Sequence, residues 1–208
     1  MRNTRLKNGL ISFCILTCAS IATAAHAGPD LVTNQLHLLL LNNMKQGEHQ
    51  TCLSRLEKLS PMVERAFDIE FISRQVLRRS WKTMTPDLQG RFIDLLKQQI
   101  ALSYASNFDA YAGESFVPEI FDPEGKQSAK HLVRFHRPDQ PPLQFEYVLR
   151  LHQGIWRIAN IVVDGVSDLA LRSAQYRTAI RDGGITHLLD TLSGQTEQSR
   201  QNCVGVSY

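Results

Sequence analysis

The spacing of apolar residues changes at Gly113, and this change constrains the fold more than any other feature of the sequence. Before Gly113, apolar residues recur with the period of a helix, and the longest such run extends from Leu88 to Tyr104. After Gly113, apolar and polar residues alternate, as in strands with one buried face. Helices followed by a separate block of strands predict an α+β domain.

Four strands are predicted after Gly113, over residues 115–121, 130–137, 143–151 and 155–163. The breaks between them (DPEG, RPDQPP and HQG) are short and rich in turn formers, which favours antiparallel neighbours. We therefore expect a curved four-stranded antiparallel sheet covered by several helices.

The fourth predicted strand is apolar on both faces. Strict alternation places Trp156, Ile158 and Val162 on one face, and Ile155, Ala159, Ile161 and Val163 on the other. A strand of this kind is expected to be central or covered on both sides.

Several helix starts are marked by residues that cap free backbone N–H groups. Asp68 precedes a helix that is expected to continue to Trp81, and Thr85 with Pro86 precedes the run from Leu88. Ser60 before Pro61 and Ser167 after the strand end at Asp164 are read in the same way. A break at Gly183–Gly184 divides the last helical region into two helices.

The first 27 residues have the features of a secretory signal peptide: cations at Arg2, Arg5 and Lys7, an apolar run, and small residues ending at Ala27. A lipoprotein signal acylated at Cys18 is the alternative, although Thr17 is a poor residue before such a cysteine. Removing the three cations leaves as many basic as acidic residues, so the mature chain has no charge excess for nucleic acid or an anionic membrane. We expect an exported protein that is periplasmic in a bacterium.

Two cysteines, Cys52 and Cys203, remain after the signal is removed. In an oxidising compartment they are candidates for one disulfide, and the alternative is a buried thiol with a second thiol in the C-terminal tail. Neither cysteine belongs to a CxxC motif or has a neighbouring His, so no catalytic thiol is predicted.

No sequence pattern indicates catalysis, a metal site or a cofactor. Ser167 lies in GVSDL, which lacks the second glycine of a nucleophile elbow, and it is read as a helix cap. Asp164 with Gly165 suits a turn, with a general base at the mouth of a cone-shaped α+β fold as the alternative. His131 and His136 lie on opposite faces of one predicted strand, so no single metal could bridge them.

Short motifs in a fixed order resemble the toluene-tolerance family of periplasmic lipid-binding proteins, also called the MlaC family. These motifs are Phe67-Asp68, Leu77, Trp81, Pro86, Phe92, Tyr104, Phe108, Tyr111, Gly113-Glu114, Trp156-Arg157-Ile158, the VVDGVS run at 162–167, Arg177, Gly184 and Leu188-Leu189. The run SDLALRSAQY at 167–176 is similar to the hopanoid-associated HpnM branch. Leu77-Arg78 stands where the family usually has Leu-Gly.

The resemblance implies an NTF2-like or MlaC-like fold that encloses an apolar cavity, in a domain over residues 28–195 that follows the signal peptide. Its parts would be helices over 28–114, the sheet over 115–163 and C-terminal helices over 164–195, with a tail at 196–208. It implies a monomeric, cofactor-free carrier of phospholipid or hopanoid that serves membrane-anchored components of an ABC-type lipid transport system and is not an enzyme.

Candidate lipid-contacting residues are taken from the apolar and aromatic positions of these segments. They are Phe71, Leu77, Trp81, Phe92, Leu96, Ile100, Tyr104, Phe108, Phe145, Tyr147, Trp156, Ile158, Val162, Val166, Leu169 and Tyr176. The alternative for these side chains is ordinary core. Two other functions stay open: an enzyme of the cone-shaped α+β class, and a lipid-free docking module.

Overall fold

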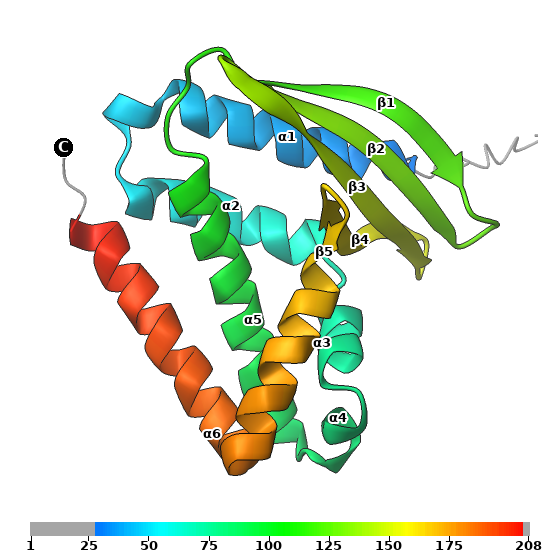
Figure 1. Cartoon of the computed structure of the whole chain (residues 1–208), viewed down its shortest axis with the longest axis vertical. Helices are drawn as coiled ribbons and strands as arrows, with labels where there is room; N and C mark the ends of the chain where they lie inside the picture. Colours follow the sequence, from blue (N-terminus) through cyan, green and yellow to red (C-terminus); the bar gives the residue numbers. More distant parts are fainter. Residues whose placement is uncertain (1–27, 206–208) are drawn as a thin grey trace, which may run out of the picture.

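The computed structural model describes residues 28–205 as one layer of helices packed against an antiparallel sheet (Figure 1). The predicted α+β class is confirmed, whereas the expected signal peptide lies outside the described residues. In chain order the elements are α1 (Pro29–Lys45), a 3-10 turn (Gly47–His49), α2 (Cys52–Ala66), α3 (Ile69–Leu77), α4 (Arg79–Thr83), α5 (Pro86–Asn107), β1 (Ser115–Pro123), β2 (Ser128–Arg137), β3 (Gln140–His152), β4 (Ile155–Val163), β5 (Val166–Ser167) and α6 (Asp168–Gly205).

The sheet contains the four predicted strands in sequence order and one more, β5. The predicted strand count was one too low because β5 is only two residues long and leads directly into α6. β5 pairs with β4 across a tight turn at Asp164 and Gly165, whose φ angles are 47° and 82°. Two successive residues with positive φ are typical of the type I′ hairpin turn that an Asp-Gly pair favours.

A β-bulge in β4 changes which of its residues face the helices. Ile158 and Asn160 both have partners on β3, but Ala159 between them has none. The extra residue reverses the alternation, so that Ile158 shares a face with Ile161 and not with Val162. The strict alternation predicted from the sequence is therefore wrong at this point.

The cap predictions at Asp68, Thr85 and Ser167 are confirmed, because each side-chain oxygen accepts a hydrogen bond from the N–H three residues later. The predicted start at Ser60–Pro61 is wrong, since α2 continues through Pro61. The Ser60 hydroxyl donates to the carbonyl of Leu56, at 2.7 Å, which ties it to the preceding turn of the same helix.

The helix after Asp68 is interrupted before Trp81, contrary to the prediction. Arg78 has φ 49° and ψ −114°, and it separates α3 from α4. A residue with a Cβ is strained in this conformation, which glycine adopts more readily.

The last helix, α6, consists of two arms that meet at Gly184, where φ is 77° and the backbone is not helical (Figure 1). The break predicted there is confirmed, but the second arm extends to Gly205, through residues that the sequence analysis assigned to a tail. Cys203 is buried near its end and forms a disulfide with Cys52 at the start of α2, with 5.1 Å between the Cα atoms.

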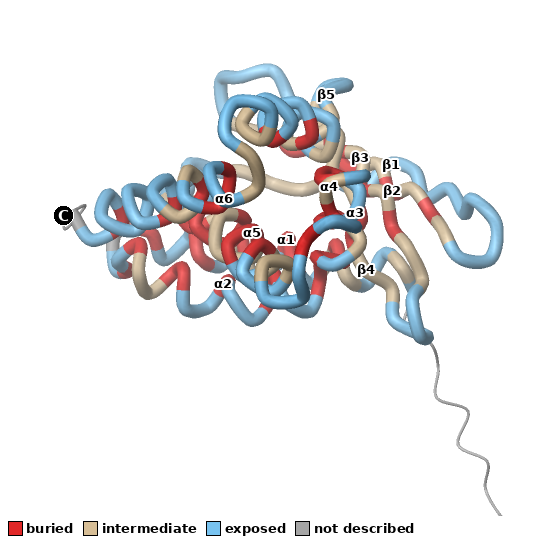
Figure 2. The backbone as a smooth tube through the Cα atoms, turned by 90° about the horizontal axis from the view of Figure 1, so that it is seen from below, coloured by how far each residue is buried: buried red, intermediate tan, exposed pale blue. Residues whose placement is uncertain are grey.

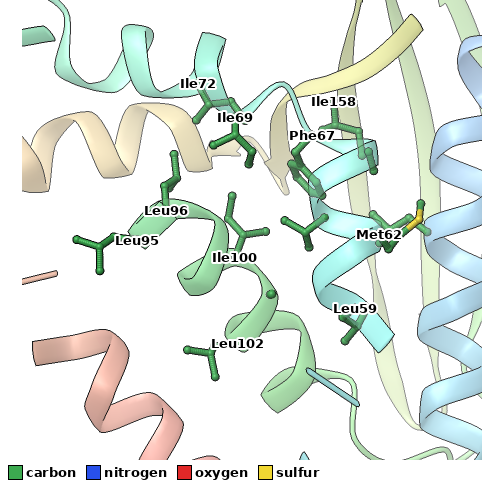
Figure 3. Packing of buried hydrophobic residues seen from close by; sticks show 14 of the residues in the cluster. Leu59, Met62, Phe67, Ile69, Ile72, Leu95, Leu96, Ile100, Leu102 and Ile158 are labelled. Carbon is green, nitrogen blue, oxygen red and sulfur yellow. The ribbon is translucent and has the colours of Figure 1, made fainter. Parts of the chain in front are cut away.

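The core lies where α2, α3 and α5 meet β4 (Figure 3). Leu59 of α2 and Leu96 of α5 are fully buried there, together with Ile158 of β4. Buried stretches of the helices face the interior of the molecule, and the loop between β1 and β2 is exposed (Figure 2). Within residues 28–205, no helix combines the length and hydrophobicity that crossing a bilayer requires.

Replacing Arg78 with glycine is expected to raise the free energy of unfolding by about 1 kcal/mol, because relief of strain exceeds the entropic cost of glycine. Urea denaturation monitored by circular dichroism measures this. The exposed Lys82, in the helical turn that follows, is the matched control. There, glycine has no strain to relieve and should lower stability by roughly 1 kcal/mol. A loss of stability in Arg78→Gly would contradict this account.

Removing the disulfide is expected to destabilise the protein by about 4 kcal/mol, because Cys52 and Cys203 are 151 residues apart and their bond restricts the unfolded chain. The test compares urea unfolding of the wild type, with and without reductant, with that of the Cys52→Ser/Cys203→Ser variant. Reductant should destabilise the wild type and leave the double variant unchanged. Equal stability of all samples would contradict the prediction.

Candidate functional site

A pocket of about 270 Å³ lies where α5 passes β4 and the start of α6. Most of its lining is apolar or aromatic. Of the five polar residues, Ser103, Asn107 and Asp168 are exposed, which places them at the mouth, and Asn160 and Arg172 are half-buried. The complete lining is Phe67, Ile72, Ile100, Ser103, Tyr104, Asn107, Phe108, Phe145, Ala159, Asn160, Ile161, Val163, Asp168, Leu169 and Arg172. Its inner wall is thus suited to hydrocarbon and its rim to polar groups.

Aromatic side chains continue from the pocket wall into the interior of the molecule. Phe108 in the wall contacts Phe135 and Phe116, with ring centroids 5.8 Å and 6.2 Å away. Phe116 in turn stacks on His37 of α1 at 4.1 Å. The concave face of the sheet is therefore covered by a continuous aromatic layer, which reaches from the pocket to α1.

Asn160 on the pocket wall joins β4, β5 and α6. Its side-chain oxygen accepts from the Leu169 N–H at 3.1 Å, and its amide donates to the Ser167 hydroxyl at 3.0 Å. Because Ser167 also caps α6, this network sets where the first arm of α6 leaves the sheet. Leu169, the second residue of α6, is thereby held over the pocket.

An ion pair joins Arg172 and Asp168 at the rim, with 2.7 Å between Nε and Oδ2. Arg172 also donates to the Tyr176 hydroxyl at 3.4 Å. The guanidinium is largely covered, with 18% of its side chain exposed, whereas the Asp168 side chain is 48% exposed. The pair lets a cation lie beside an apolar pocket without leaving an unpaired buried charge.

The titratable groups at the pocket are not arranged for proton transfer. Burial, and to a smaller extent the Asp168 carboxylate, raises the pKa of Tyr104 far above its usual value, so its hydroxyl stays protonated. Asp168 is paired and exposed at the mouth. Asp164 is not in the lining, and its carboxylate accepts from the backbone N–H of Gln144 at 2.8 Å. Within residues 28–205, no three potential metal ligands lie together.

A buried polar pair lies on the α1 side of the aromatic layer, where His37 Nε2 is 2.8 Å from the Tyr147 hydroxyl. Burial, with a smaller contribution from the nearby His131, lowers the pKa of His37 to about 3. His37 is therefore neutral at pH 7 and forms a hydrogen bond with the Tyr147 hydroxyl. His131 lies 2.6 Å from the Thr33 hydroxyl, and burial lowers the pKa of His131 as well.

The structure distributes the predicted lipid-contacting residues over several environments. The pocket brings together Ile100, Tyr104, Phe108, Phe145 and Leu169. The core beside it contains Leu77, Trp81, Phe92, Leu96, Tyr147, Ile158 and Tyr176.

Four predicted residues lie away from the pocket. Trp156 lines a separate hollow between the start of α1, the end of α2 and the β3–β4 turn. Phe71 lies under the guanidinium of Arg150, 3.8 Å from its ring centre. Val162 is on the opposite face of β4, and Val166 in β5 is 59% exposed. The role assigned to Val162 is corrected by the bulge, and that of Val166 by the short hairpin, which turns it outward.

The sequence analysis missed the small and polar members of the lining. Ala159 and Asn160 belong to the lining, whereas Ile161 and Val163 were assigned to the wrong face of their strand. Arg172 is not among the predicted lipid-contacting residues, because no apolar pattern could have selected it. A bulge depends on pairing with β3, which a single strand does not encode.

The fold and the pocket define an α+β protein with an apolar cavity between a curved sheet and its covering helices. A family model described as "MlaC protein" matches residues 33–194, and the chain belongs to this family. A solved structure, the phospholipid-binding protein from Ralstonia solanacearum in complex with a phospholipid, is similar over 84% of this chain and 99% of that one, with a TM-score of 0.73 and 16% identity. That likeness shows the fold. Among curated proteins, none matches the chain significantly.

As the pH is lowered, the free energy of unfolding is expected to fall more steeply in the wild type than in His37→Gln. The unfolded histidine binds a proton below pH 6.5, whereas folded His37 resists protonation down to about pH 3. The contribution of His37 to the free energy of unfolding is therefore complete above pH 6.5. It decreases by about 1.4 kcal/mol for each pH unit between pH 6.5 and pH 3.

Urea denaturation between pH 7 and pH 4.5 measures this difference, with His136→Gln at an exposed position as the control. The control should follow the wild type. Parallel curves for the wild type and His37→Gln would contradict a neutral, buried His37.

Proposed function

We propose that this protein is a periplasmic lipid carrier, exported through its signal peptide, that binds a phospholipid or a hopanoid and moves it between membranes. The observation that carries the proposal is the pocket with an apolar wall and a polar mouth, in the fold of the MlaC family. The bound phospholipid in the structurally similar Ralstonia protein supports it.

The energetics of lipid transfer explain what such a pocket must supply. Each methylene buried from water gains ~0.8 kcal/mol, so a sixteen-carbon chain entering water unprotected loses on the order of 12 kcal/mol. A carrier must offset most of this cost with apolar contacts. The wall of Phe67, Tyr104, Phe108 and Phe145 provides such contacts, and no reacting group is needed.

The pocket, at about 270 Å³, is near the lower limit of the roughly 300–1,000 Å³ that is typical of ligand pockets. We infer that it widens on loading, through movement of the first arm of α6. That arm covers the pocket with Leu169 and lies between two points with positive φ, the turn at Gly165 and the kink at Gly184. The second arm is held to α2 by the disulfide.

Two finer assignments belong to the same proposal. The run at 167–176 is similar to the HpnM branch, which favours a hopanoid, whereas the phospholipid in the Ralstonia protein favours a two-chain lipid. The expected partners are membrane-anchored components of an ABC-type system, with the protein acting as a monomer.

An enzyme would need a titrating group inside the pocket, and the groups described above give this alternative no support. Asp164 occupies a turn, Ser167 caps a helix, and Tyr104 stays protonated. No feature of residues 28–205 favours a lipid-free docking module over a carrier.

Filling the pocket is expected to reduce bound lipid. Leu169→Trp adds bulk to the lining, and the overpacking cost of about 1–3 kcal/mol should lower occupancy about tenfold or more. Native mass spectrometry of the mature protein, followed by organic extraction, measures the lipid from a host that makes both phospholipids and hopanoids.

Leu171→Trp is the matched control for this variant, because Leu171 lies two residues further along α6 and is 51% exposed. It should retain wild-type lipid content. Asp164→Asn should also retain it, since asparagine tolerates positive φ and can accept the same hydrogen bond. A lipid-free wild type would reject the carrier function.

A further inference from the structure

A second hollow, about 570 Å³ in volume, is lined mostly by polar side chains of α5 and of both arms of α6. The two arms diverge from the kink at Gly184 (Figure 1). Glutamines line all three sides: Gln99 on α5, Gln175 on the first arm, and Gln195 with Gln198 on the second arm. We call this hollow the glutamine groove. It shares two residues, Ser103 and Arg172, with the apolar pocket, so the two cavities adjoin.

The lining of the glutamine groove suits hydroxyl groups. A glutamine amide both donates and accepts hydrogen bonds, as a hydroxyl does, and the serines of the groove add groups of the same kind. No carboxylate is among the residues that line it. The single cation, Arg172, is already paired with Asp168 at 2.7 Å and donates to Tyr176.

The pairing of Arg172 and the lack of charge on the other lining residues argue against a phosphate in the glutamine groove. An anionic group would have to compete with the Asp168 carboxylate for Arg172, and the glutamines carry no charge to attract it. A neutral, hydroxyl-rich group can instead hydrogen-bond to the glutamines without disturbing the ion pair.

We propose that the glutamine groove binds the uncharged, polyhydroxylated head group of a lipid whose hydrocarbon occupies the adjoining apolar pocket. This inference rests on the proposed carrier function and specifies its ligand class. Arg172 and Ser103 stand at the boundary, where the linkage between head group and hydrocarbon would pass.

The test measures uptake by the mature protein from phosphatidylcholine vesicles that contain one of three probes with identical acyl chains. The probes are digalactosyldiacylglycerol, diacylglycerol and phosphatidylglycerol. After separation from the vesicles, mass spectrometry quantifies the lipid bound per protein. Free digalactose is added as a competitor in a parallel series, to separate a lipid head group from a free sugar.

The wild type should take up the glycolipid about tenfold better than diacylglycerol or phosphatidylglycerol, as expected for the loss of a few hydrogen bonds. Gln175→Leu/Gln195→Leu/Gln198→Leu, at three exposed positions, should reduce this preference to less than about twofold and leave diacylglycerol uptake unchanged. Gln75→Leu, at an exposed position on α3 outside both cavities, is the control and should behave as wild type.

Equal uptake of all three probes would overturn the head-group assignment while leaving the carrier function intact. A preference for phosphatidylglycerol would overturn the neutral character of the head group. Displacement of the glycolipid by equimolar free digalactose would show a sugar site that is independent of lipid. If the protein takes up none of the probes, the carrier function itself fails.

Discussion

Asp68 connects the helical part of the chain to the sheet, and the position of the pocket depends on this connection. Its backbone N–H donates to the carbonyl of Ile158 in β4, at 2.9 Å. One carboxylate oxygen caps α3, and the other accepts from Arg150 of β3 at 2.9 Å. Since the residue is 7% exposed, loss of either partner of the carboxylate would leave a buried charge poorly compensated. Phe67, its neighbour, is thereby held in the pocket wall.

Local chemistry was a good guide to the fold and a poor guide to the pocket. The caps at Asp68, Thr85 and Ser167 were predictable because capping depends on a few successive residues. The bulge at Ala159 was not, because it depends on pairing with β3, and the interruption at Arg78 was not, because no glycine or proline marks it in the sequence. The pocket contains residues that the local sequence predicts and residues that it does not. Ile100 and Tyr104 follow from a helical period, whereas Asn160 and Arg172 are polar, so that no apolar period selects them.

The first arm of α6 has two functional faces in this proposal. Leu169 faces the apolar pocket, Gln175 faces the polar groove, and Arg172 lies at the boundary of both. An amphiphilic ligand requires such a change from hydrocarbon to polar surroundings over a short distance. The paired guanidinium provides it, because its charge is balanced by Asp168 while its alkyl stem can lie along apolar surface.

The disulfide has a topological consequence for the exported protein. Together with the backbone, the bond between Cys52 and Cys203 closes a covalent ring that contains every strand and the whole pocket lining. A protease that cuts once within this ring, for example in the exposed segment around Gly125, produces two peptides that stay linked. The nicked molecule would keep its pieces at a fixed, high local concentration, so the protein could survive a first cleavage without losing a part of the pocket lining.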